Sequence, residues 1–426
     1  MSAARILTMS APSNISFAVD DIDLGDLKFW RLPHQQREAA FATLRRQRPV
    51  AWFSEPEIPM MSAGPGFWAI TRYDDVMHVS RNPHLFISGR GTNIPDLPPA
   101  MIELFGSMIN MDAPRHTKLR LIVNRGFTPR MVAKLEEGVV ERARTIVDAV
   151  APRGECDLVP DVAGALPLQV ICDMMGIPAE EHRWIFDLSN KILGAADPEY
   201  GGDPMVAVAA GMELFQYALS LGEERKTNPG EDLTSALMRA DIEGQALTPQ
   251  ELGSFFILLV VAGNETTRNA ISHGMWFLTQ HPDQRKIWMD DFEGVAPTAI
   301  DEIVRMASPV IHFRRTATAD TVVGGQQIAA GDKVVLWYNS ANRDESHWDE
   351  PDRFDVRRQP NDHLGFGGGG PHFCLGAHLA RREIKVMYDE LFRRLPDIEA
   401  SAEPDYLESA FINGVKHLPV EFTPVA

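Results

Sequence analysis

One uninterrupted helical pattern, from Thr248 to Gln280, constrains the fold more than any other segment. Thr248-Pro249-Gln250-Glu251 has the form of a capping box with proline at the first helical position, and His281-Pro282 ends the pattern. A helix of about 32 residues is about 48 Å long, enough to cross a whole domain. Its stretch 255–262 is apolar on every face, which requires surrounding protein or lipid. We expect protein, because this apolar run is far shorter than the roughly 20 residues that span a bilayer.

The composition places the chain among ordinary globular proteins. Of 426 residues, 44% are hydrophobic and 23% are charged, so a large buried core is possible. The net charge of −18 opposes attraction to nucleic acid or to an anionic membrane. We expect no signal peptide and no transmembrane anchor. The three cysteines, Cys156, Cys172 and Cys374, have neither disulfide nor zinc spacing, which fits a reducing cytoplasm.

The sequence predicts a mainly α protein with a small β region. Thr128-Pro129 caps a helix whose apolar residues recur every three or four positions up to Val150. Strand patterns cover 67–71, 321–328, 333–338 and 411–422, the last with Asn413-Gly414 as a possible hairpin turn. The stretch 83–114 is rich in Gly and Pro, which predicts a long loop that acts as a lid over a ligand. We expect a flexible N-terminal extension over 1–21 and a single domain over 22–426.

The most informative segment leads through four glycines, residues 367–370, into Cys374. Apolar residues at helical spacing follow from Leu379 to Leu395, so Cys374 lies near a helix start, where backbone N–H groups are unpaired and the helix dipole is positive. Such a position lowers the pKa of a thiol and favours the thiolate. The glycines let the backbone approach a flat ligand and turn amide hydrogens toward sulfur. A buried structural cysteine behind a flexible turn is the alternative that these residues leave open.

This segment, residues 364–381, closely resembles the cysteine loop of the cytochrome P-450 haem-thiolate monooxygenases. The resemblance runs from Ile22 to Pro424 and implies the cytochrome P-450 fold, with its long central helix crossing over haem. It implies that Cys374 ligates the iron of haem b (iron protoporphyrin IX) and that O2 is the co-substrate. A thiolate ligand pushes electron density onto iron and favours O–O cleavage. One departure is that Phe366 lies eight positions before Cys374 instead of seven, as if one glycine were inserted.

The middle of the long helix carries a second feature that the resemblance explains. Residues 262–267, Ala-Gly-Asn-Glu-Thr-Thr, place glycine and polar side chains in an apolar helix, which is destabilising unless they have partners or a function. A kink or a packing defect is the plain structural interpretation. The segment resembles the family's acid and alcohol pair, which implies that Glu265 and Thr266 are catalytic and relay protons to O2. Ala262 is implied to contact the haem.

Four basic residues match the family's partners of the haem propionates. His116 and Arg120 are four apart and project from one helical face, a pattern that by itself is typical of solvated surface charge. The resemblance implies that both bind propionates, together with Arg315 and His372. Arg314, next to Arg315, is easily mistaken for the ligand.

A third group is expected to be structural. Glu302 and Arg305 are three apart, a spacing that usually gives only a weak surface ion pair. They resemble the family's structural Glu-x-x-Arg pair. Pro351-Asp352-Arg353-Phe354 resembles the third element, which implies that Arg353 joins the pair.

Shorter segments, 106–109, 166–169, 260–269, 340–345 and 411–416, look most like bacterial members that hydroxylate the terminal (ω) methyl groups of methyl-branched lipids and sterol side chains. The implied reaction inserts one O atom into an unactivated C–H bond near the methyl end of a methyl-branched fatty acid, isoprenoid or sterol side chain. The implied pocket is mostly apolar, although apolar residues are usually plain core. Its candidate substrate-binding residues are Asn93, Phe105, Met108, Leu258, Val261, Ala262, Val310 and Phe411.

The sequence after the cysteine helix is strand-like and does not have the pattern of a reductase domain. We therefore expect electrons to come from NAD(P)H through separate redox proteins. The resemblance implies a small acidic ferredoxin with its ferredoxin reductase. The expected docking site lies within a basic cluster, Lys118, Arg120, Arg125, Arg130, Arg357, Arg358, Arg381 and Arg382.

Two rival functions stay open. One is a peroxygenase driven by hydrogen peroxide, against which Glu265-Thr266 argues because such an enzyme needs no proton relay to O2. The other is a non-catalytic haem protein that senses or carries a gas or lipid. The polar break in the long helix would then have no purpose.

Overall fold

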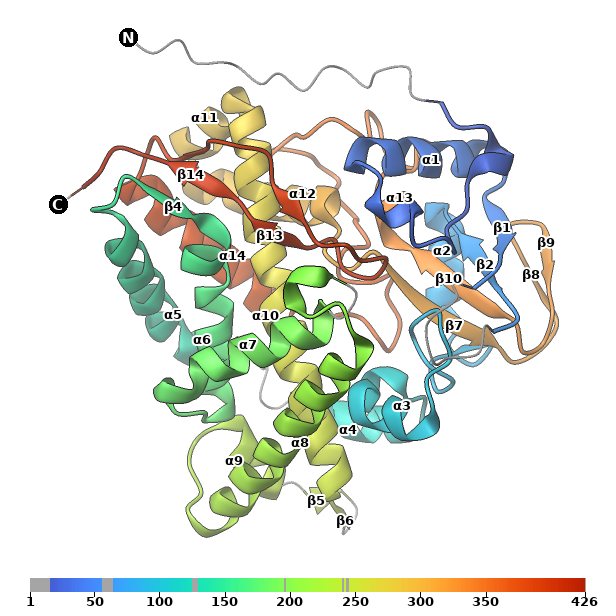
Figure 1. The fold of residues 1–426 in the computed structure, drawn as a ribbon, viewed down its shortest axis with the longest axis horizontal. Helices are drawn as coiled ribbons and strands as arrows, with labels where there is room; N and C mark the ends of the chain where they lie inside the picture. The colour runs from blue at the N-terminus through green and yellow to red at the C-terminus, as the bar shows by residue number, and fades with distance from the viewer. Residues whose placement is uncertain are drawn as a thin grey trace.

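The computed structural model describes residues 16–55, 64–124, 129–194, 197–239, 241–242 and 245–425. Most of its helices lie on one side and the largest sheet lies on the other (Figure 1), so the predicted mainly α class with a small β region is confirmed. The helices are α1 His34–Gln47, α2 Tyr73–Arg81, α3 Pro99–Gly106, α4 Arg115–Asn124, α5 Pro129–Val150, α6 Ala165–Met175, α7 His182–Leu193, α8 Pro204–Thr227, α9 Leu233–Arg239, α10 Pro249–Gln280, α11 Pro282–Asp290, α12 Phe292–Ala307, α13 Tyr338–Ala341 and α14 Ala377–Arg394. The strands are β1 Val50–Phe53, β2 Phe67–Ile70, β3 Phe86–Ile87, β4 Glu155–Asp157, β5 Asp241–Ile242, β6 Gln245–Ala246, β7 His312–Ala317, β8 Thr321–Val323, β9 Gln326–Ile328, β10 Lys333–Trp337, β11 Glu399–Ala400, β12 Asp405–Tyr406, β13 Val415–His417 and β14 Pro419–Glu421.

Helix α10 is the predicted long helix and passes through the middle of the helical side (Figure 1). Its 32 residues begin with the predicted capping box, in which Thr248 Oγ1 accepts from the Glu251 N–H at 3.1 Å and the Glu251 carboxylate accepts from the Thr248 N–H at 2.9 Å. Helices α6, α7, α8, α12 and α14 pack around it, and most of its side chains are buried. The prediction of a helix surrounded by protein is confirmed.

Two other helices frame the region around the cysteine loop. Helix α14 follows Cys374 and packs against α5, α10 and α12, with Ile384, Met387 and Leu391 in the largest core cluster. Helix α5 ends at Val150, as its apolar spacing predicts. Its predicted cap, Thr128, lies outside the described residues.

The largest sheet fixes the strand that carries Arg314 and Arg315. Its strand order is β1-β2-β10-β7-β3, and β10 pairs in parallel with β2 and antiparallel with β7. On one face Trp337 of β10 stacks on Trp30 and packs against Phe41 of α1. Since β7 lies between β10 and β3, its backbone is held on both sides. The strands predicted over 67–71, 321–328 and 333–338 correspond to β2, to the β8–β9 hairpin and to β10.

The C-terminal strands do not form the hairpin predicted over 411–422. Strand β13 pairs with β12, and β14 pairs with β11 and β4. Asn413-Gly414 is therefore not a hairpin turn. Asn413 donates from Nδ2 to the Ala307 carbonyl, and the Val415 N–H donates to the Asn269 side chain. These bonds tie the segment to α12 and α10 and override the local turn preference.

The segment 83–114 is not one long loop either. It contains β3, α3 and a 3-10 helix, Ser107–Asn110. Pro98 and Pro99 lie at the start of α3, where proline is tolerated because the first N–H groups of a helix have no partner inside it. The high proline content thus marks a helix start as well as turns. A lid role for this segment stays a prediction.

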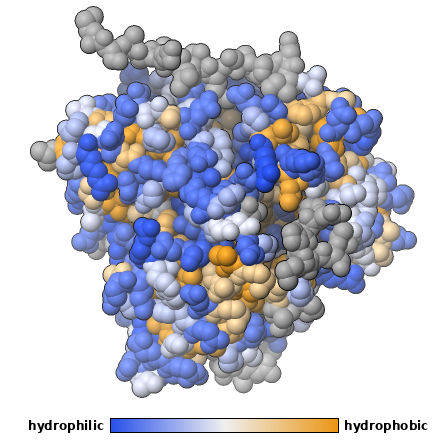
Figure 2. All heavy atoms as spheres, in the orientation of Figure 1, coloured by the Kyte–Doolittle hydropathy of each residue, from blue (hydrophilic) through white to orange (hydrophobic). Residues whose placement is uncertain are grey.

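Helix α8 is long and apolar enough, by length and composition alone, to cross a membrane, and 39% of its most apolar window is buried. Core helices can have the same length and composition, and α8 packs on α7, α9 and α10. Met205 and Met212 of α8 are exposed. Figure 2 shows apolar residues scattered among polar ones on the face of the molecule that it draws.

Candidate active site

One cavity lies between the middle of α10, the start of α14 and the loop before it, with further walls from α4 and β7. It encloses about 1450 Å³ of space free of atoms, part of which is open to solvent. All six residues predicted to bind the cofactor line it, namely His116, Arg120, Ala262, Arg315, His372 and Cys374. The fold therefore gathers residues that lie far apart in the sequence.

Cys374 lies just before α14. Its N–H donates to the Phe366 carbonyl at 2.9 Å. Burial raises the pKa of the thiol above its ordinary value, although hydrogen bonds from the N–H groups of Gly376 and Ala377 and the nearby charges of Arg120 and Arg381 lower it. The N–H groups at the helix start lower this pKa, as predicted, but desolvation outweighs them, so the net shift is upward and the free thiol is favoured. A metal ion at the sulfur reverses such a balance, since a coordinating thiol is deprotonated.

Two of the glycines before Cys374 are required by close packing. Gly370 has a φ of +79°, and a Cβ on it would lie 2.5 Å from the Ser80 carbonyl oxygen. A Cβ on Gly368 would lie 2.6 Å from Ser80 Oγ. The loop thus passes the end of α2 at a distance that only glycine permits. Despite the additional glycine, the loop keeps Phe366 and Cys374 hydrogen-bonded.

The four predicted propionate partners bring basic side chains together at the cavity. The rings of His116 and His372 lie 4.3 Å apart, centre to centre. Burial, and then the charges of Arg315, His116 and Arg120, lower the pKa of His372 to about 3. Burial also lowers the pKa of His116, Arg120 and Arg315, and Asp112 opposes this effect at His116 and Arg315. In each of these groups, the lowering of the pKa by burial outweighs the opposing effects of nearby acidic groups and of hydrogen bonds.

The hydrogen bonds of these four groups also leave them without a carboxylate partner. His116 Nε2 is buried and has no hydrogen-bond partner, which is a costly state for a polar atom. Arg120 donates to the Phe373 carbonyl and Arg315 to the Arg314 carbonyl, so each guanidinium is held by backbone rather than by a carboxylate. We name His116, Arg120, Arg315 and His372 the cavity cluster. It is suited to an anionic group such as a carboxylate.

Arg314 does not belong to the cavity cluster. Successive side chains of a strand point to opposite faces, and Arg314 is not part of the cavity wall. Its guanidinium pairs with Asp96 at 2.7 Å and donates to the carbonyls of Arg90, Asn93 and Ile94. It anchors the segment before α3, so the two neighbouring arginines have different partners.

The predicted acid and alcohol pair on α10 points in two directions. Thr266 lines the cavity, and its hydroxyl donates to the Ala262 carbonyl at 2.8 Å. Glu265 is buried outside the cavity wall and forms an ion pair with Arg268, which also donates to Asn190 of α7 at 2.8 Å. The second carboxylate oxygen of Glu265, Oε2, is buried without a hydrogen-bond partner. A relay role for Glu265 stays a prediction, and it requires the carboxylate to turn away from Arg268.

Two polar residues of the cavity wall have no role predicted from the sequence. Thr267 of α10 and Glu383 of α14 both line the cavity and are hydrogen-bonded to each other. Glu383 lies among the buried positions of α14, next to Ile384. A glutamate on the buried face of an amphipathic helix is the signal that could have identified it.

Glu302 and Arg305 form the predicted structural pair, with both side chains fully buried. Arg305 donates to the two carboxylate oxygens at 2.7 and 2.9 Å and to the carbonyls of Asn342 and Pro351. The third member is Arg358, whose Nε donates to Glu302 at 3.1 Å. We name Glu302, Arg305 and Arg358 the Glu302 cluster.

The prediction that Arg353 supplies the third side chain is wrong. Arg353 closes a turn, with its N–H donating to the Glu350 carbonyl, and this turn directs its side chain to solvent. There the side chain is 55% exposed and pairs with Glu350 at 2.8 Å. Only its carbonyl takes part, by accepting from Arg305 and Arg358.

The candidate substrate-binding residues divide into two sets. Met108, Leu258, Ala262 and Val310 line the cavity, whereas Asn93, Phe105, Val261 and Phe411 do not. In the second set, the Asn93 carbonyl accepts from Arg314, Phe105 packs on Gly211 of α8, Val261 packs on the largest core cluster, and Phe411 packs edge-on against His312 and Phe313. Contact of all eight with a substrate stays a prediction.

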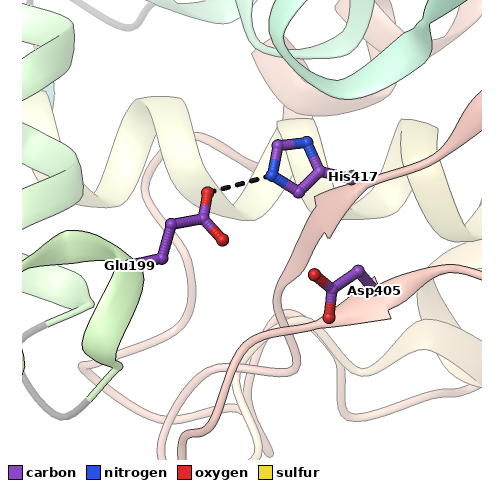
Figure 3. Close-up of side chains that lie close together, drawn as sticks. All are labelled: Glu199, Asp405 and His417. Carbon is purple, nitrogen blue, oxygen red and sulfur yellow. Dashed lines mark hydrogen bonds and ion pairs between the residues drawn. The ribbon is translucent and has the colours of Figure 1, made fainter.

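A separate group, Glu199, Asp405 and His417, brings potential metal ligands together (Figure 3). His417 Nε2 lies 2.9 Å from the Glu199 carboxylate, and its Nδ1 lies 2.5 Å from that of Asp157. The ammonium of Lys416 lies 3.2 Å from Glu199 and 3.5 Å from Asp405. Because Lys416 already supplies positive charge, we interpret these five residues as an ion-pair group, the His417 clasp. It ties the turn after α7, Pro198–Tyr200, to β12, β13 and β4.

Comparison with known proteins defines the family. The sequence model of the cytochrome P-450 family matches residues 294–406. Methyl-branched lipid omega-hydroxylase of Mycobacterium tuberculosis is 52% identical and aligns over 95% of each chain. Steroid C26-monooxygenase of Rhodococcus jostii is 43% identical over 97% of this chain and 87% of its own. This chain is a cytochrome P-450.

The fold agrees with that conclusion. A solved cytochrome P-450 of Mycobacterium marinum, in complex with pseudoionone, has a TM-score of 0.90 and 42% identity, covering 95% of this chain and 99% of its own. The predicted family and fold are confirmed. As a cytochrome P-450, the protein is a monooxygenase that works with haem, O2 and external electron donors. Its site fits haem, because a thiol and a buried basic cluster with an unsatisfied His116 nitrogen line the same cavity.

Proposed function

We propose that this cytochrome P-450 holds haem b through Cys374 as the iron ligand and through the cavity cluster as partners of the two propionates. The observation that carries the proposal is that one cavity is lined by the thiol and by four basic groups, none of which forms an ion pair with a carboxylate among the described residues. Haem b, whose porphyrin has no covalent link to the protein, is favoured because Cys374, the proposed iron ligand, is the only cysteine among the described residues of the cavity wall, which leaves no second thiol there to bond to the porphyrin.

The test is substitution of the thiol. Cys374→Ala should abolish the thiolate-type carbon monoxide difference spectrum. Cys156→Ala is the matched control, because this partly buried thiol lies outside the cavity wall, and it should leave the spectrum unchanged. A Cys374→Ala protein that retains the spectrum would overturn the assignment.

Bound haem supplies O2 activation, and thiolate ligation favours cleavage of the O–O bond. The chain supplies protons and excludes water. The Thr266 hydroxyl donates to the Ala262 carbonyl, which leaves its oxygen lone pairs to accept hydrogen bonds at the cavity wall. We propose that Thr266 passes protons into the cavity and that Glu265 takes them up at Oε2, the oxygen without a partner.

The substrate that we propose is a methyl-branched lipid, an isoprenoid or a sterol side chain, hydroxylated at or near a terminal methyl group. The names of the relatives support this class. The wall beside α10 supports it too, because it is lined by large apolar side chains that include Met108, Phe255, Leu258, Leu259, Val310 and Phe313. Each buried CH2 group of a lipid contributes about 0.8 kcal/mol, so such a wall favours hydrocarbon and selects by shape.

A spectral titration with methyl-branched, straight-chain and sterol lipids tests the substrate class, followed by mass spectrometry of the products. We expect methyl-branched lipids to bind tightest and to gain one oxygen atom at the methyl end. A preference for straight chains or aromatic compounds would overturn the substrate class and leave the monooxygenase reaction in place.

For the electron donor we propose a ferredoxin, reduced by a ferredoxin reductase, that docks near Cys374. Apolar contacts are available, since Leu121 of α4 is 62% exposed and Phe373 is 40% exposed. Arg357 is exposed, whereas Arg358 and Arg381 pair with Glu302 and Asp301. Of the other predicted basic residues, Lys118 and Arg382 stay candidates, Arg120 lines the cavity, and Arg125 and the Arg130 side chain lie outside the described residues.

Two variants test the docking site. Leu121→Glu and Arg357→Glu should raise the KM for ferredoxin, because an added carboxylate repels an acidic partner. Product formation driven by hydrogen peroxide needs no partner and should be unchanged. An unchanged KM for ferredoxin in both variants would place the docking site elsewhere.

We also propose that 22–426 form one domain that acts in the cytoplasm. A single core cluster joins residues from α3 to the C-terminal strands, which supports one domain. The free thiols of Cys156 and Cys172 suit a reducing compartment. Of the predicted extension over 1–21, residues 1–15 lie outside the described residues, while Phe17 and Val19 pack on the core around α1.

A further inference from the structure

Ser88 is a buried serine to which the proposed function gives no role. It follows strand β3 directly and is 1% exposed. Its hydroxyl oxygen lies 3.2 Å from His372 Nε2, within hydrogen-bond distance. His372 lines the cavity, whereas Ser88 does not. Ser88 therefore supports a residue of the cavity wall from outside the wall.

Three elements that carry members of the cavity cluster meet at Ser88. Strand β3, which leads into Ser88, pairs with β7, the strand of Arg315. The N–H groups of Ser88 and Gly89 each donate to the Asp112 carboxylate at 2.8 Å. The Asp112 carbonyl in turn accepts from the His116 N–H, at the start of α4. The backbone of Ser88 is thus fixed between β7 and α4, and its side chain reaches the cysteine loop.

A hydroxyl is well suited to hold a histidine ring. A ring nitrogen donates when it carries a proton and accepts when it does not, and a hydroxyl can do either. Ser88 can therefore stay bonded to Nε2 whichever ring nitrogen of His372 carries the proton. A carbonyl can only accept, as the Met111 carbonyl does from His372. The hydroxyl holds the ring in place without fixing which side carries the N–H.

The position of His372 also bears on its neighbour His116. The two rings lie 4.3 Å apart, centre to centre, so a displaced His372 ring would disturb the packing of His116. His116 Nε2 is the buried nitrogen without a hydrogen-bond partner. The single hydrogen bond of Ser88 therefore bears on two of the four groups of the cavity cluster.

We propose that Ser88 is a positioning residue of the haem site, whose hydroxyl holds the rings of His372 and His116 in the orientation that receives an anionic group of the cofactor. This inference rests on the proposed function, in which the cavity cluster binds the propionates. Ser88 acts through His372, because it lies outside the cavity wall.

The first experiment measures how fast haem leaves the haem-loaded protein, with excess haem-free myoglobin as the acceptor. Ser88→Ala should lose haem about 2- to 10-fold faster than wild type, the effect of one neutral hydrogen bond. Ser88→Thr keeps the hydroxyl and should restore most of the wild-type rate. Ser80→Ala is the matched control, because the Ser80 hydroxyl is buried beside the same loop, near Gly368, without a hydrogen-bond partner. Its rate should equal that of wild type.

A double variant separates positioning from a merely structural role. His372→Ala should lose haem faster than wild type. Adding Ser88→Ala to it should have no further effect, because the ring through which Ser88 acts is already absent. A serine that only stabilised the turn after β3 would add its full effect to that of His372→Ala.

The reduction potential supplies a second readout that does not depend on activity. Hydrogen bonds and charges around haem tune its potential. We expect a more negative potential in Ser88→Ala than in wild type, because a less well bound propionate leaves more negative charge near the iron. Ser80→Ala should match wild type, and Ser88→Ala should cause no shift in a His372→Ala protein.

Equal rates of haem loss and equal potentials in wild type and Ser88→Ala, with normal carbon monoxide spectra, overturn this inference alone. Additive effects of Ser88→Ala and His372→Ala overturn it as well. A wild-type protein without the thiolate-type spectrum overturns the proposed function and this inference with it. Should Ser88→Ala fail to fold, Ser88→Cys decides, because its sulfur fills the site but is only a weak hydrogen-bond partner. A Ser88→Cys protein that keeps haem as long as wild type then overturns the inference.

Discussion

The Glu302 cluster and the cavity cluster differ in how buried positive charge is balanced. In the Glu302 cluster, Arg305 and Arg358 share one carboxylate and add several backbone carbonyls. In the cavity cluster, two arginines and two histidines converge, and His116 keeps a nitrogen without a partner. Burial is therefore not what marks a functional site. The Glu302 cluster has its carboxylate within the chain and holds the fold together, whereas we propose that the haem propionates supply the anion for the cavity cluster.

The largest effect should follow from breaking the Glu302 cluster. Arg305→Leu leaves the buried Glu302 carboxylate without its bidentate partner, and we expect a loss of about 3–5 kcal/mol in the free energy of unfolding. Urea denaturation of the haem-free protein measures it. A loss near zero would show that Arg358 alone balances Glu302 and would remove the basis of the comparison.

The equivalent change in the cavity cluster should affect binding more than folding. Arg315→Leu removes one charged partner of the anion, so we expect haem affinity to fall by roughly 10- to 100-fold, the equivalent of about 1.5–3 kcal/mol for a charged hydrogen bond. The haem-free protein should lose less stability than Arg305→Leu does, since the buried Arg315 guanidinium is costly to desolvate and its substitution leaves no bidentate carboxylate partner behind. Haem titration and urea denaturation of the same samples measure both. Equal losses of stability in the two variants would contradict the distinction.

Arg358 and Arg353 provide a smaller and sharper contrast. Arg358→Ala removes a donor to Glu302 and should cost about 1–3 kcal/mol. Arg353→Ala removes an exposed side chain and should leave the free energy of unfolding nearly unchanged. Thermal denaturation of both variants measures the order, and the reverse order would restore Arg353 as the third member.

The smallest effect concerns pH and the His417 clasp. Partial burial lowers the pKa of His417, but hydrogen bonds with Asp157 and Glu199 outweigh burial and raise this pKa above its ordinary value. The stabilisation by protonated His417 is therefore complete below the unfolded pKa of about 6.5 and is lost as pH rises through the raised folded value. We expect less than about 1 kcal/mol, because the clasp is largely exposed and screened. Urea denaturation at several pH values should show the loss in wild type and its absence in His417→Gln, while identical profiles would exclude the clasp as its source.

Sequence alone predicted helix α10, and it named the four residues that the fold brings together in the cavity cluster, whose binding of propionates stays a prediction. The capping box at Thr248 and the proline after His281 mark both ends of α10, so its length follows from local signals. The members of the cavity cluster lie in short motifs, such as the i, i+4 pair His116 and Arg120, which a family resemblance transfers intact.

What the sequence did not predict depends on orientation in three dimensions. Adjacent residues on a helix point about 100° apart, so the sequence does not tell which neighbours of Thr266 share its cavity. Thr267 lines the cavity with Thr266, whereas Glu265 is held outside it by Arg268, which also bonds to Asn190 of α7. Whether Arg353 or Arg358 faces Glu302 depends on the turn at Glu350, which has no periodic signal. The order of the C-terminal strands likewise depends on distant partners, Asn269 and Ala307.

The unsatisfied nitrogen of His116 also bears on how long each molecule survives in the cell. A fold that concentrates positive charge around a buried polar atom is less stable before its anionic partner arrives than after. A ligand that binds only the folded chain pulls the folding equilibrium toward that chain in proportion to its free concentration. Degradation acts mainly on unfolded molecules. The abundance of this monooxygenase should therefore rise and fall with the supply of haem, even when its rate of synthesis is constant.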